Sequence, residues 1–171
     1  MAIETPKYKL LKKDKKIQIR DYESAVIAKT YVTDNFKEAS STGFRRIANF
    51  IFGGNSKGKN ISMTAPVVVL KEYNTNKHEV FFFMPRKYEI ETLPKPSLES
   101  VVLENKALGK VASISFGGWA TEKSISYNKE ILKKYLKKNS YEILDNFMVA
   151  QYNSPWALPP FRKNEIIVKI N

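Results

Sequence analysis

Residues 25–54 carry the sequence AVIAKTYVTDNFKEASSTGFRRIANFIFGG, and this stretch decides the fold. Its first eight residues are rich in β-branched side chains and predict a strand. Asn35 is a typical helix cap, and Glu38 follows it at the spacing of a capping box. Apolar residues then recur at helical spacing until Gly53 and Gly54 end the helix. This stripe consists of Phe36, Ala39, Phe44, Ile47, Ala48 and Ile51.

The same order of elements occurs twice along the chain. Around the first helix, strands are predicted within 8–20 and at 25–32, 63–70 and 79–85. A proline-rich segment at about 92–99 predicts a linker. Beyond it we expect strands at 101–105, 111–116, 147–152 and 165–170 and a helix at 121–138. One stripe of this helix consists of Ile125, Asn128, Leu132, Tyr135 and Leu136. The pattern is a ββαββ pseudo-duplication, with repeats at about 7–86 and 100–171, within a single domain of residues 1–171.

Neither repeat can bury both faces of its sheet alone. We therefore predict an α+β fold, a distorted antiparallel β-barrel with two flanking helices. Phe81, Phe82 and Phe83 are consecutive, and side chains alternate between the faces of a strand. Either both faces are covered there, or one ring faces a groove.

Composition excludes several classes of protein. The chain has 171 residues and no Cys, which rules out disulfides, thiolate metal sites and a Cys nucleophile. No apolar run approaches the length of a membrane span, and the first residues lack the apolar segment of a signal peptide. We therefore expect a cytoplasmic protein.

The charge is strongly basic, with 29 Lys and Arg against 17 Asp and Glu and a net charge of +12. Of these basic residues 24 are Lys, whereas recognition of base edges favours the planar fork of Arg. We expect weak, salt-sensitive attraction to polyanions and no specific nucleic-acid binding.

No catalytic constellation is visible. His78 is the only His, in a polar stretch that reads as a turn, so we expect it to be exposed. Residues 53–60 match the G-x-x-x-x-G-K pattern of a phosphate loop, but Asn60 stands where Ser or Thr should bind magnesium. The segment also follows a helix and precedes a strand, the reverse of a phosphate loop. It is interpreted as a flexible connection, and the protein is not expected to be an enzyme.

A proline-rich segment at 152–162 places large apolar residues outside regular structure. These are Trp156, Leu158 and Phe161. Loops seldom carry such side chains unless they close the end of a barrel or line a pocket for a flat hydrophobic ligand, and both interpretations stay open.

Several motifs, in order and over nearly the whole chain, are similar to those of one family. The segments are Glu4–Tyr8, Ile17–Tyr22, Gly43–Phe44, Phe50–Asn55, Met63–Val67, Phe83–Pro85, Phe116–Trp119, Ala150–Trp156 and Arg162–Glu165. The combination of Met-Thr-Ala-Pro-Val with the late Tyr-Asn-Ser-Pro and Arg-x-Asn-Glu is specific. The chain resembles the SOUL haem-binding protein family.

The resemblance implies the same distorted barrel, of a gyrase-inhibitor-like effector-binding architecture, and non-enzymatic binding of haem or another tetrapyrrole as a carrier or buffer. It also implies a hydrophobic cleft between the first helix and the loop before the last strand. The cleft residues would be Phe44, Ala48, Ile51, Trp156, Leu158 and Phe161. A rim for the propionates would come from Arg45, Arg46 and Arg162.

The chain departs from the family pattern at three positions. Asp21 stands where some members have a His proposed as axial ligand, and Ser41 and Asn49 stand at positions that are basic in members of the family. Met63 and Met84 are expected to be core side chains. If haem binds, we expect weak, non-covalent binding without His ligation and no metal site in the protein itself.

Two other functions are kept as alternatives. The first is binding of another amphipathic small molecule on the same fold. The second, weaker one is a protein-interaction scaffold that uses the basic surface. We expect a monomer.

Overall fold

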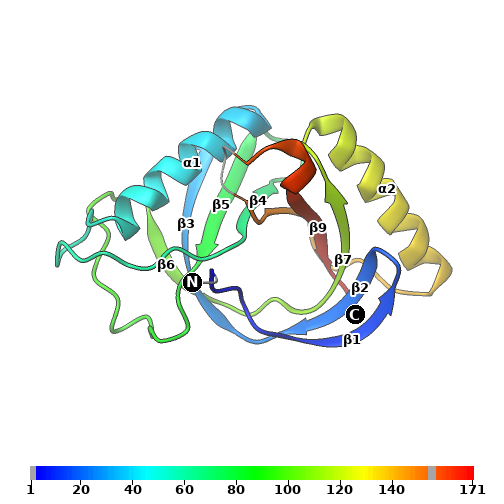
Figure 1. The fold of residues 1–171 in the computed structure, drawn as a ribbon, viewed down its shortest axis with the longest axis horizontal. Helices are drawn as coiled ribbons and strands as arrows, with labels where there is room; N and C mark the ends of the chain where they lie inside the picture. Colours follow the sequence, from blue (N-terminus) through cyan, green and yellow to red (C-terminus); the bar gives the residue numbers. More distant parts are fainter. Residues whose placement is uncertain (1–2, 154–156) are drawn as a thin grey trace. The chain divides into compact units, whose positions relative to one another are not determined.

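The computed structural model describes residues 3–153 and 157–171, and the chain forms two compact units. Unit 1 contains residues up to 6 and residues 24–107. Unit 2 contains residues 7–23 and 108–171. Each unit has antiparallel strands and one helix, α1 or α2 (Figure 1).

Unit 1 has four paired strands in the order β4-β5-β3-β6, and α1 lies over one face of this sheet. Asn35 caps α1, because its side-chain oxygen accepts a hydrogen bond from the Glu38 amide at 3.0 Å, which confirms the predicted helix start. The bounds are β3 (Ala25–Thr33), α1 (Phe36–Ile51), β4 (Val67–Lys71), β5 (Lys77–Phe83) and β6 (Val102–Lys106).

The core of unit 1 lies between α1 and its sheet. It includes Ala28, Ile47, Phe50, Ile51, Val69, Val80 and Phe82. Gly43 lets the helix approach closely, because a Cβ on this residue would lie 2.5 Å from Val80 Cβ. Phe44 is half-buried at the edge of this core, with its ring 5.6 Å from the ring of Phe82.

The opposite face of the same sheet is also apolar. Phe81 and Phe83 alternate with Phe82 and are buried, with their rings edge to face at 5.6 Å. Ile27 pairs with Phe83 and Val68 with Phe81, so these side chains share that face. Of the two alternatives for the Phe run, both faces are covered.

Unit 2 has five paired strands in the order β1-β2-β7-β9-β8, and α2 packs on β7 and β9. Thr121 and Ser124 form a capping box at the start of α2, and Asn128, Leu132 and Leu136 are buried, as the predicted stripe requires. The bounds are β1 (Tyr8–Asp14), β2 (Ile17–Tyr22), β7 (Gly109–Gly117), α2 (Glu122–Lys138), β8 (Met148–Gln151), the 3-10 turn η1 (Pro159–Phe161) and β9 (Lys163–Lys169).

The predicted α+β class, antiparallel strands with two helices, is confirmed. The pairing adds that strands cross between the two predicted repeats: β6 of the second repeat pairs with β3 of the first, and β2 of the first pairs with β7 of the second. The segment 92–99 lies within unit 1, with Leu93 in its core. The repeat boundaries stay a prediction about the pattern along the chain.

Two local predictions were wrong. His78 is not exposed in a turn; it is on β5 and only 2% exposed, because the strand begins at Lys77 and turns this side chain inward against the Phe36 ring. The strand expected at 63–70 begins only at Val67, after Pro66, which has no N–H to donate to a ladder.

No helix among the described residues is long and apolar enough to cross a membrane.

Candidate functional site

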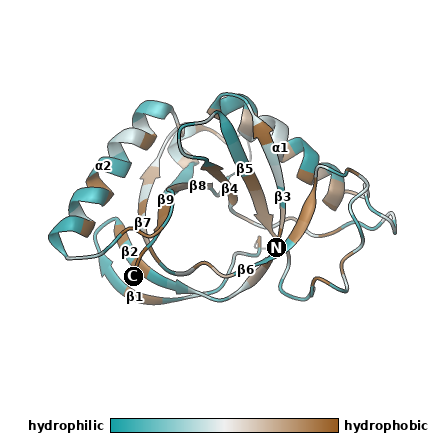
Figure 2. Cartoon of the chain, turned by 180° about the vertical axis from the view of Figure 1, so that it is seen from behind, coloured by the Kyte–Doolittle hydropathy of each residue, from teal (hydrophilic) through white to brown (hydrophobic). Residues whose placement is uncertain are grey.

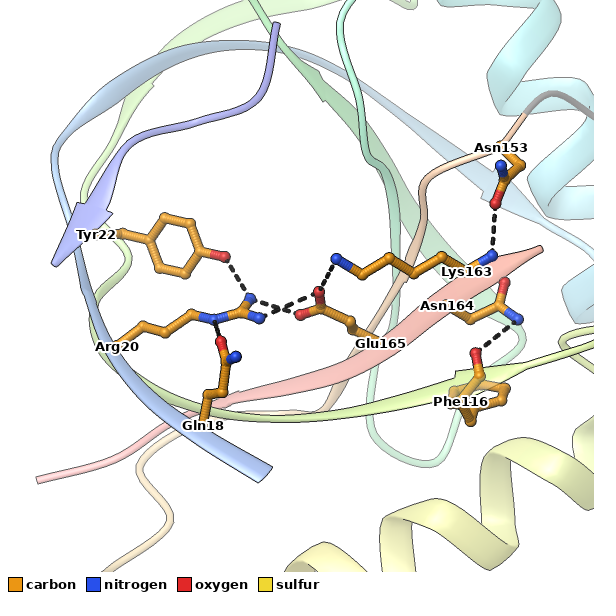
Figure 3. Close-up of polar contacts among 8 residues, drawn as sticks. All are labelled: Gln18, Arg20, Tyr22, Phe116, Asn153, Lys163, Asn164 and Glu165. Carbon is orange, nitrogen blue, oxygen red and sulfur yellow. Dashed lines mark hydrogen bonds and ion pairs between the residues drawn. The ribbon is translucent and has the colours of Figure 1, made fainter. Parts of the chain in front are cut away.

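A cluster of polar side chains lies on one face of the sheet of unit 2. We call Gln18, Arg20, Tyr22, Tyr152 and Glu165 the polar cluster. Arg20 and Glu165 are both buried, and the guanidinium donates to both carboxylate oxygens, at 2.5 Å from Nη1 and 3.2 Å from Nη2 (Figure 3). Arg20 also donates to the Gln18 side chain at 2.8 Å and to the Tyr22 hydroxyl at 2.9 Å.

The register of the strands explains which face this is. Lys12 lies over the Tyr135 ring of α2, and its strand partner is Ile19, so Ile19 points to the side of α2. Gln18 and Arg20 alternate with Ile19 and therefore point to the other side. The polar cluster thus occupies the sheet face that α2 does not cover.

Burial and charge shift the protonation equilibria in the cluster. Burial alone would lower the pKa of Arg20, but the hydrogen bonds and charge of Glu165 outweigh it and raise this pKa. Burial raises the pKa of Tyr152 well above its ordinary value of 10.0, and the Glu165 charge raises it further. Burial also raises the pKa of Tyr22, against the opposing effect of Arg20. The cluster therefore holds the Arg20–Glu165 ion pair and two phenols that stay neutral, and Lys163 Nζ also lies 3.4 Å from Glu165 Oε1.

Hydrogen bonds tie the loop between β8 and β9 to this sheet. Tyr152 N–H donates to the Lys163 carbonyl at 3.1 Å, and Lys163 N–H donates to Asn153 Oδ1. At the far end, Arg162 donates to the Ala157 carbonyl at 3.0 Å and stacks on the Trp119 ring at 4.6 Å. Both ends of the described loop are therefore fixed.

Asn164 also holds the end of β7, because its amide donates to the Gly118 carbonyl at 2.9 Å and, at 3.4 Å, to that of Phe116 (Figure 3). Three of the motifs quoted above, Ile17–Tyr22, Ala150–Trp156 and Arg162–Glu165, supply this network. Sequence reasoning did not single out Arg20 or Glu165 as partners. The sequence offers no local signal for the pair, because Gln18 and Asp21 accompany Arg20 on β2, and Lys163 and Asn164 precede Glu165 on β9.

The predicted cleft residues fall into two groups, one in each unit. In unit 1, Phe44 and Ala48 are partly exposed on α1, whereas Ile51 is 1% exposed and part of the core. Arg45 is exposed and bonds Thr42, while Arg46 donates to Thr30 and to the Tyr31 carbonyl. In this unit Phe44, Ala48 and Arg45 are therefore the predicted residues most open to a ligand.

In unit 2, Leu158 and Phe161 flank and end the turn η1 and are 65% and 75% exposed. Arg162 is buried against Trp119, which is itself half exposed. Trp156 lies outside the described residues. Leu158, Phe161 and Trp119 thus give unit 2 an apolar surface that its own core does not use.

The candidate iron ligands are poorly placed. Asp21 is exposed on β2. His78 is buried, its Nδ1 lies 3.0 Å from the Asn76 carbonyl oxygen, and burial lowers its pKa. Met84 is in the core of unit 1, and Met63 packs against it. The described residues contain no group of three or more His, Asp or Glu side chains that could hold a metal ion.

Comparison with known proteins places the chain among relatives of similar length. Heme-binding protein 1 of Xenopus laevis is 26% identical, over 96% of this chain and 91% of the relative. Heme-binding protein 1 of Mus musculus is 30% identical, over 91% of this chain and 84% of the relative. A solved structure described as a hydrolase from Listeria innocua has a TM-score of 0.65 at 8% identity and covers 94% of both chains. At that identity the likeness concerns the fold alone.

The model of the SOUL heme-binding protein family matches residues 3–169. The match includes both units and every motif of the polar cluster. The chain therefore belongs to the SOUL heme-binding protein family.

Proposed function

We propose that the protein binds haem or another tetrapyrrole without catalysing a reaction, as a carrier or buffer. The observation that carries the proposal is the exposed apolar surface at Leu158 and Phe161 in unit 2, on a loop fixed at both ends. A porphyrin is flat and apolar, and covering exposed rings of this kind is how it gains binding free energy. Membership of the family and the names of the relatives support the same ligand class.

Each unit has exposed apolar side chains that a porphyrin could contact. Leu158, Phe161 and Trp119 offer apolar contact in unit 2, and Phe44 and Ala48 offer it on α1. Of the three predicted rim residues, Arg45 donates to the Thr42 hydroxyl, whereas Arg46 and Arg162 donate to backbone carbonyls. Arg45 is therefore the rim residue most available to a propionate. Bound haem would bring redox-active iron, but the described residues offer it no well-placed axial ligand. Of the polar cluster, Tyr152 stands at the start of the loop that carries the apolar residues and joins it to β9 through its backbone N–H.

The test is a titration of the purified protein with haemin, in parallel with iron-free protoporphyrin. We expect saturable one-to-one binding of both at similar affinity, since no side chain among the described residues is well placed to ligate the iron. Phe161→Ala in unit 2 is expected to weaken binding at least about ten-fold, as loss of a covered ring predicts. Phe44→Ala applies the same test to the predicted residue on α1 of unit 1. Tyr127→Ala, which removes an exposed ring from α2, is the matched control and leaves binding unchanged.

A non-saturating response, or equal effects of all three substitutions, would exclude specific tetrapyrrole binding at these residues. Saturable binding of other flat amphipathic molecules in preference to porphyrins would favour the second candidate, a binding module for another small molecule. The observation that keeps this candidate is that residues 3–153 and 157–171 offer the iron no well-placed ligand.

A further inference from the structure

The positive charge of the protein is concentrated in unit 2. This unit contains 17 Lys and Arg against eight Asp and Glu, a net charge of +9 out of the total of +12. Six lysines fall within ten residues on the β1–β2 hairpin and are all exposed. We call Lys7, Lys9, Lys12, Lys13, Lys15 and Lys16 the hairpin lysines.

The lysines of α2 extend this surface. Lys12 Nζ lies 5.9 Å from the ring centre of Tyr135, so the hairpin lies beside the last turns of α2. Lys134, Lys137 and Lys138 are exposed on these turns. Figure 2 shows the hydrophilic colour continuing from β1 to α2.

Two exposed apolar side chains lie between hairpin lysines along β1, Leu10 on the face away from α2 and Leu11 at the irregular position of the register. Every residue of β1 is exposed, and Leu10 and Leu11 are 47% and 46% exposed. A lysine-rich strand does not need exposed leucine side chains for its solubility. Lysines around exposed leucines are the pattern of surfaces that bind anionic membranes, where the cations meet the headgroups and the leucines enter the interface.

Two other occupants fit less well. An added peptide strand would pair with the free edge of β1, but lysines and the irregular register between Leu10 and Lys12 are devices that protect an edge from pairing. A nucleic acid would use the charges but leave the leucines without a partner, and Lys in place of Arg disfavours base recognition. A lipid headgroup layer needs neither a regular strand edge nor base readout.

We propose that the β1–β2 hairpin of unit 2, with the adjacent end of α2, binds anionic phospholipid membranes peripherally. Lysines of the hairpin contact headgroup phosphates and carboxylates, and Leu10 and Leu11 insert at the level of the headgroups. The inference is independent of the tetrapyrrole proposal, because none of these residues belongs to the predicted cleft.

The experiment is flotation of the purified protein with vesicles of phosphatidylcholine alone or mixed with phosphatidylserine. We expect binding to the mixed vesicles only, lost when salt rises from about 0.1 M to about 1 M and the Debye length falls from about 10 Å to about 3 Å. Substituting Lys9, Lys12, Lys13 and Lys16 by Gln is expected to weaken binding more than about 100-fold, at about five-fold for each lysine. Leu10→Ser with Leu11→Ser is expected to weaken it about ten-fold while the charge stays constant.

The matched control is a unit 1 variant with the same change in net charge, in which the exposed Lys57, Lys59, Lys87 and Lys95 become Gln. It is expected to bind vesicles like the parent protein. Equal losses in the two lysine variants would overturn the proposal, because net charge alone would then explain binding. Retained binding in the leucine variant, or binding to a nucleic acid duplex but not to vesicles, would also overturn it.

Thermal unfolding and haemin titration in solution accompany each variant. All substituted side chains are exposed, so folding and haemin affinity are expected to stay at the parent values. Loss of haemin binding with vesicle binding intact would therefore count against the tetrapyrrole proposal alone.

Discussion

The two units use the same architecture but place different chemistry on the sheet face that lies away from the helix. In unit 1 this face carries the apolar side chains Ile27, Val68, Phe81 and Phe83. In unit 2 the corresponding face carries the buried ion pair of Arg20 and Glu165 with two tyrosines. In both units, therefore, the sheet face under the helix is packed with apolar side chains, whereas the side chains on the other face differ in chemical kind between the units.

The largest expected effect tests whether the ion pair of unit 2 is integral to the fold. Glu165→Ala leaves the Arg20 charge buried without its partner and is expected to reduce the free energy of unfolding by about 3–5 kcal/mol. The matched variant in unit 1 is Glu104→Ala, which breaks the partly exposed pair with Lys29. It is expected to cost less than about 1 kcal/mol. Urea unfolding measures both, and similar losses would contradict the contrast between the units.

The second prediction tests helix packing in unit 1. Gly43→Ala places a methyl group against Val80 and is expected to cost about 1–3 kcal/mol through overpacking. Adding Val80→Ala should restore part of this loss. In unit 2, Gly117→Ala meets only the Arg162 carbonyl oxygen, at 3.6 Å, and should have a small effect. No loss from Gly43→Ala would mean that α1 can move away from its sheet.

The third prediction concerns alkaline pH. The raised pKa of Tyr152 means that, above pH 10.0, the unfolded chain releases a proton that the folded chain retains. Stability is therefore fully present below pH 10.0 and falls as the pH rises above it. Tyr152→Phe is expected to make this fall shallower, whereas Tyr73→Phe at an exposed position of unit 1 serves as the control. Chemical unfolding across this pH range gives the slopes, and identical slopes would refute the assignment.

The fourth and smallest effect lies on the acid side and in unit 1. Burial lowers the pKa of His78, so below pH 6.5 the unfolded chain binds a proton more readily than the folded chain. This contribution is present above pH 6.5 and is lost as the pH falls. His78→Gln is expected to reduce the slope of stability between pH 7 and pH 5. The histidine resonance, followed by NMR, gives the pKa directly, and a value at or above 6.5 would contradict the prediction.

Local signals in the sequence were enough to predict both helices. Asn35 and Thr121 begin them, and the apolar stripes of α1 and α2 face the sheets as expected. The burial of His78 was missed because the strand was expected to begin at residue 79, whereas β5 begins two residues earlier, at Lys77, and therefore includes His78. The exchange of β2 and β6 between the repeats was missed because strand pairing depends on contacts between distant segments, which periodicity does not encode.

The candidate site was predicted less completely. Leu158 and Phe161 were found because large apolar residues are unusual in a proline-rich loop. Arg20 and Glu165 were not paired, since 145 residues separate them and each alone reads as a surface charge. Ile51 was selected for its position on the helical stripe, but the stripe position cannot distinguish a core side chain from one at the edge of the core.

The strand exchange has a consequence for dividing the chain. A cut within 92–99 gives an N-terminal fragment that holds the β1–β2 hairpin without β7 and lacks β6, and a C-terminal fragment with the opposite deficits. Neither fragment contains a complete sheet, so each would hold strand edges that are paired in the whole chain. The polypeptide is thus suited to fragment complementation, in which two fragments that do not fold alone recover their structure only when they are mixed.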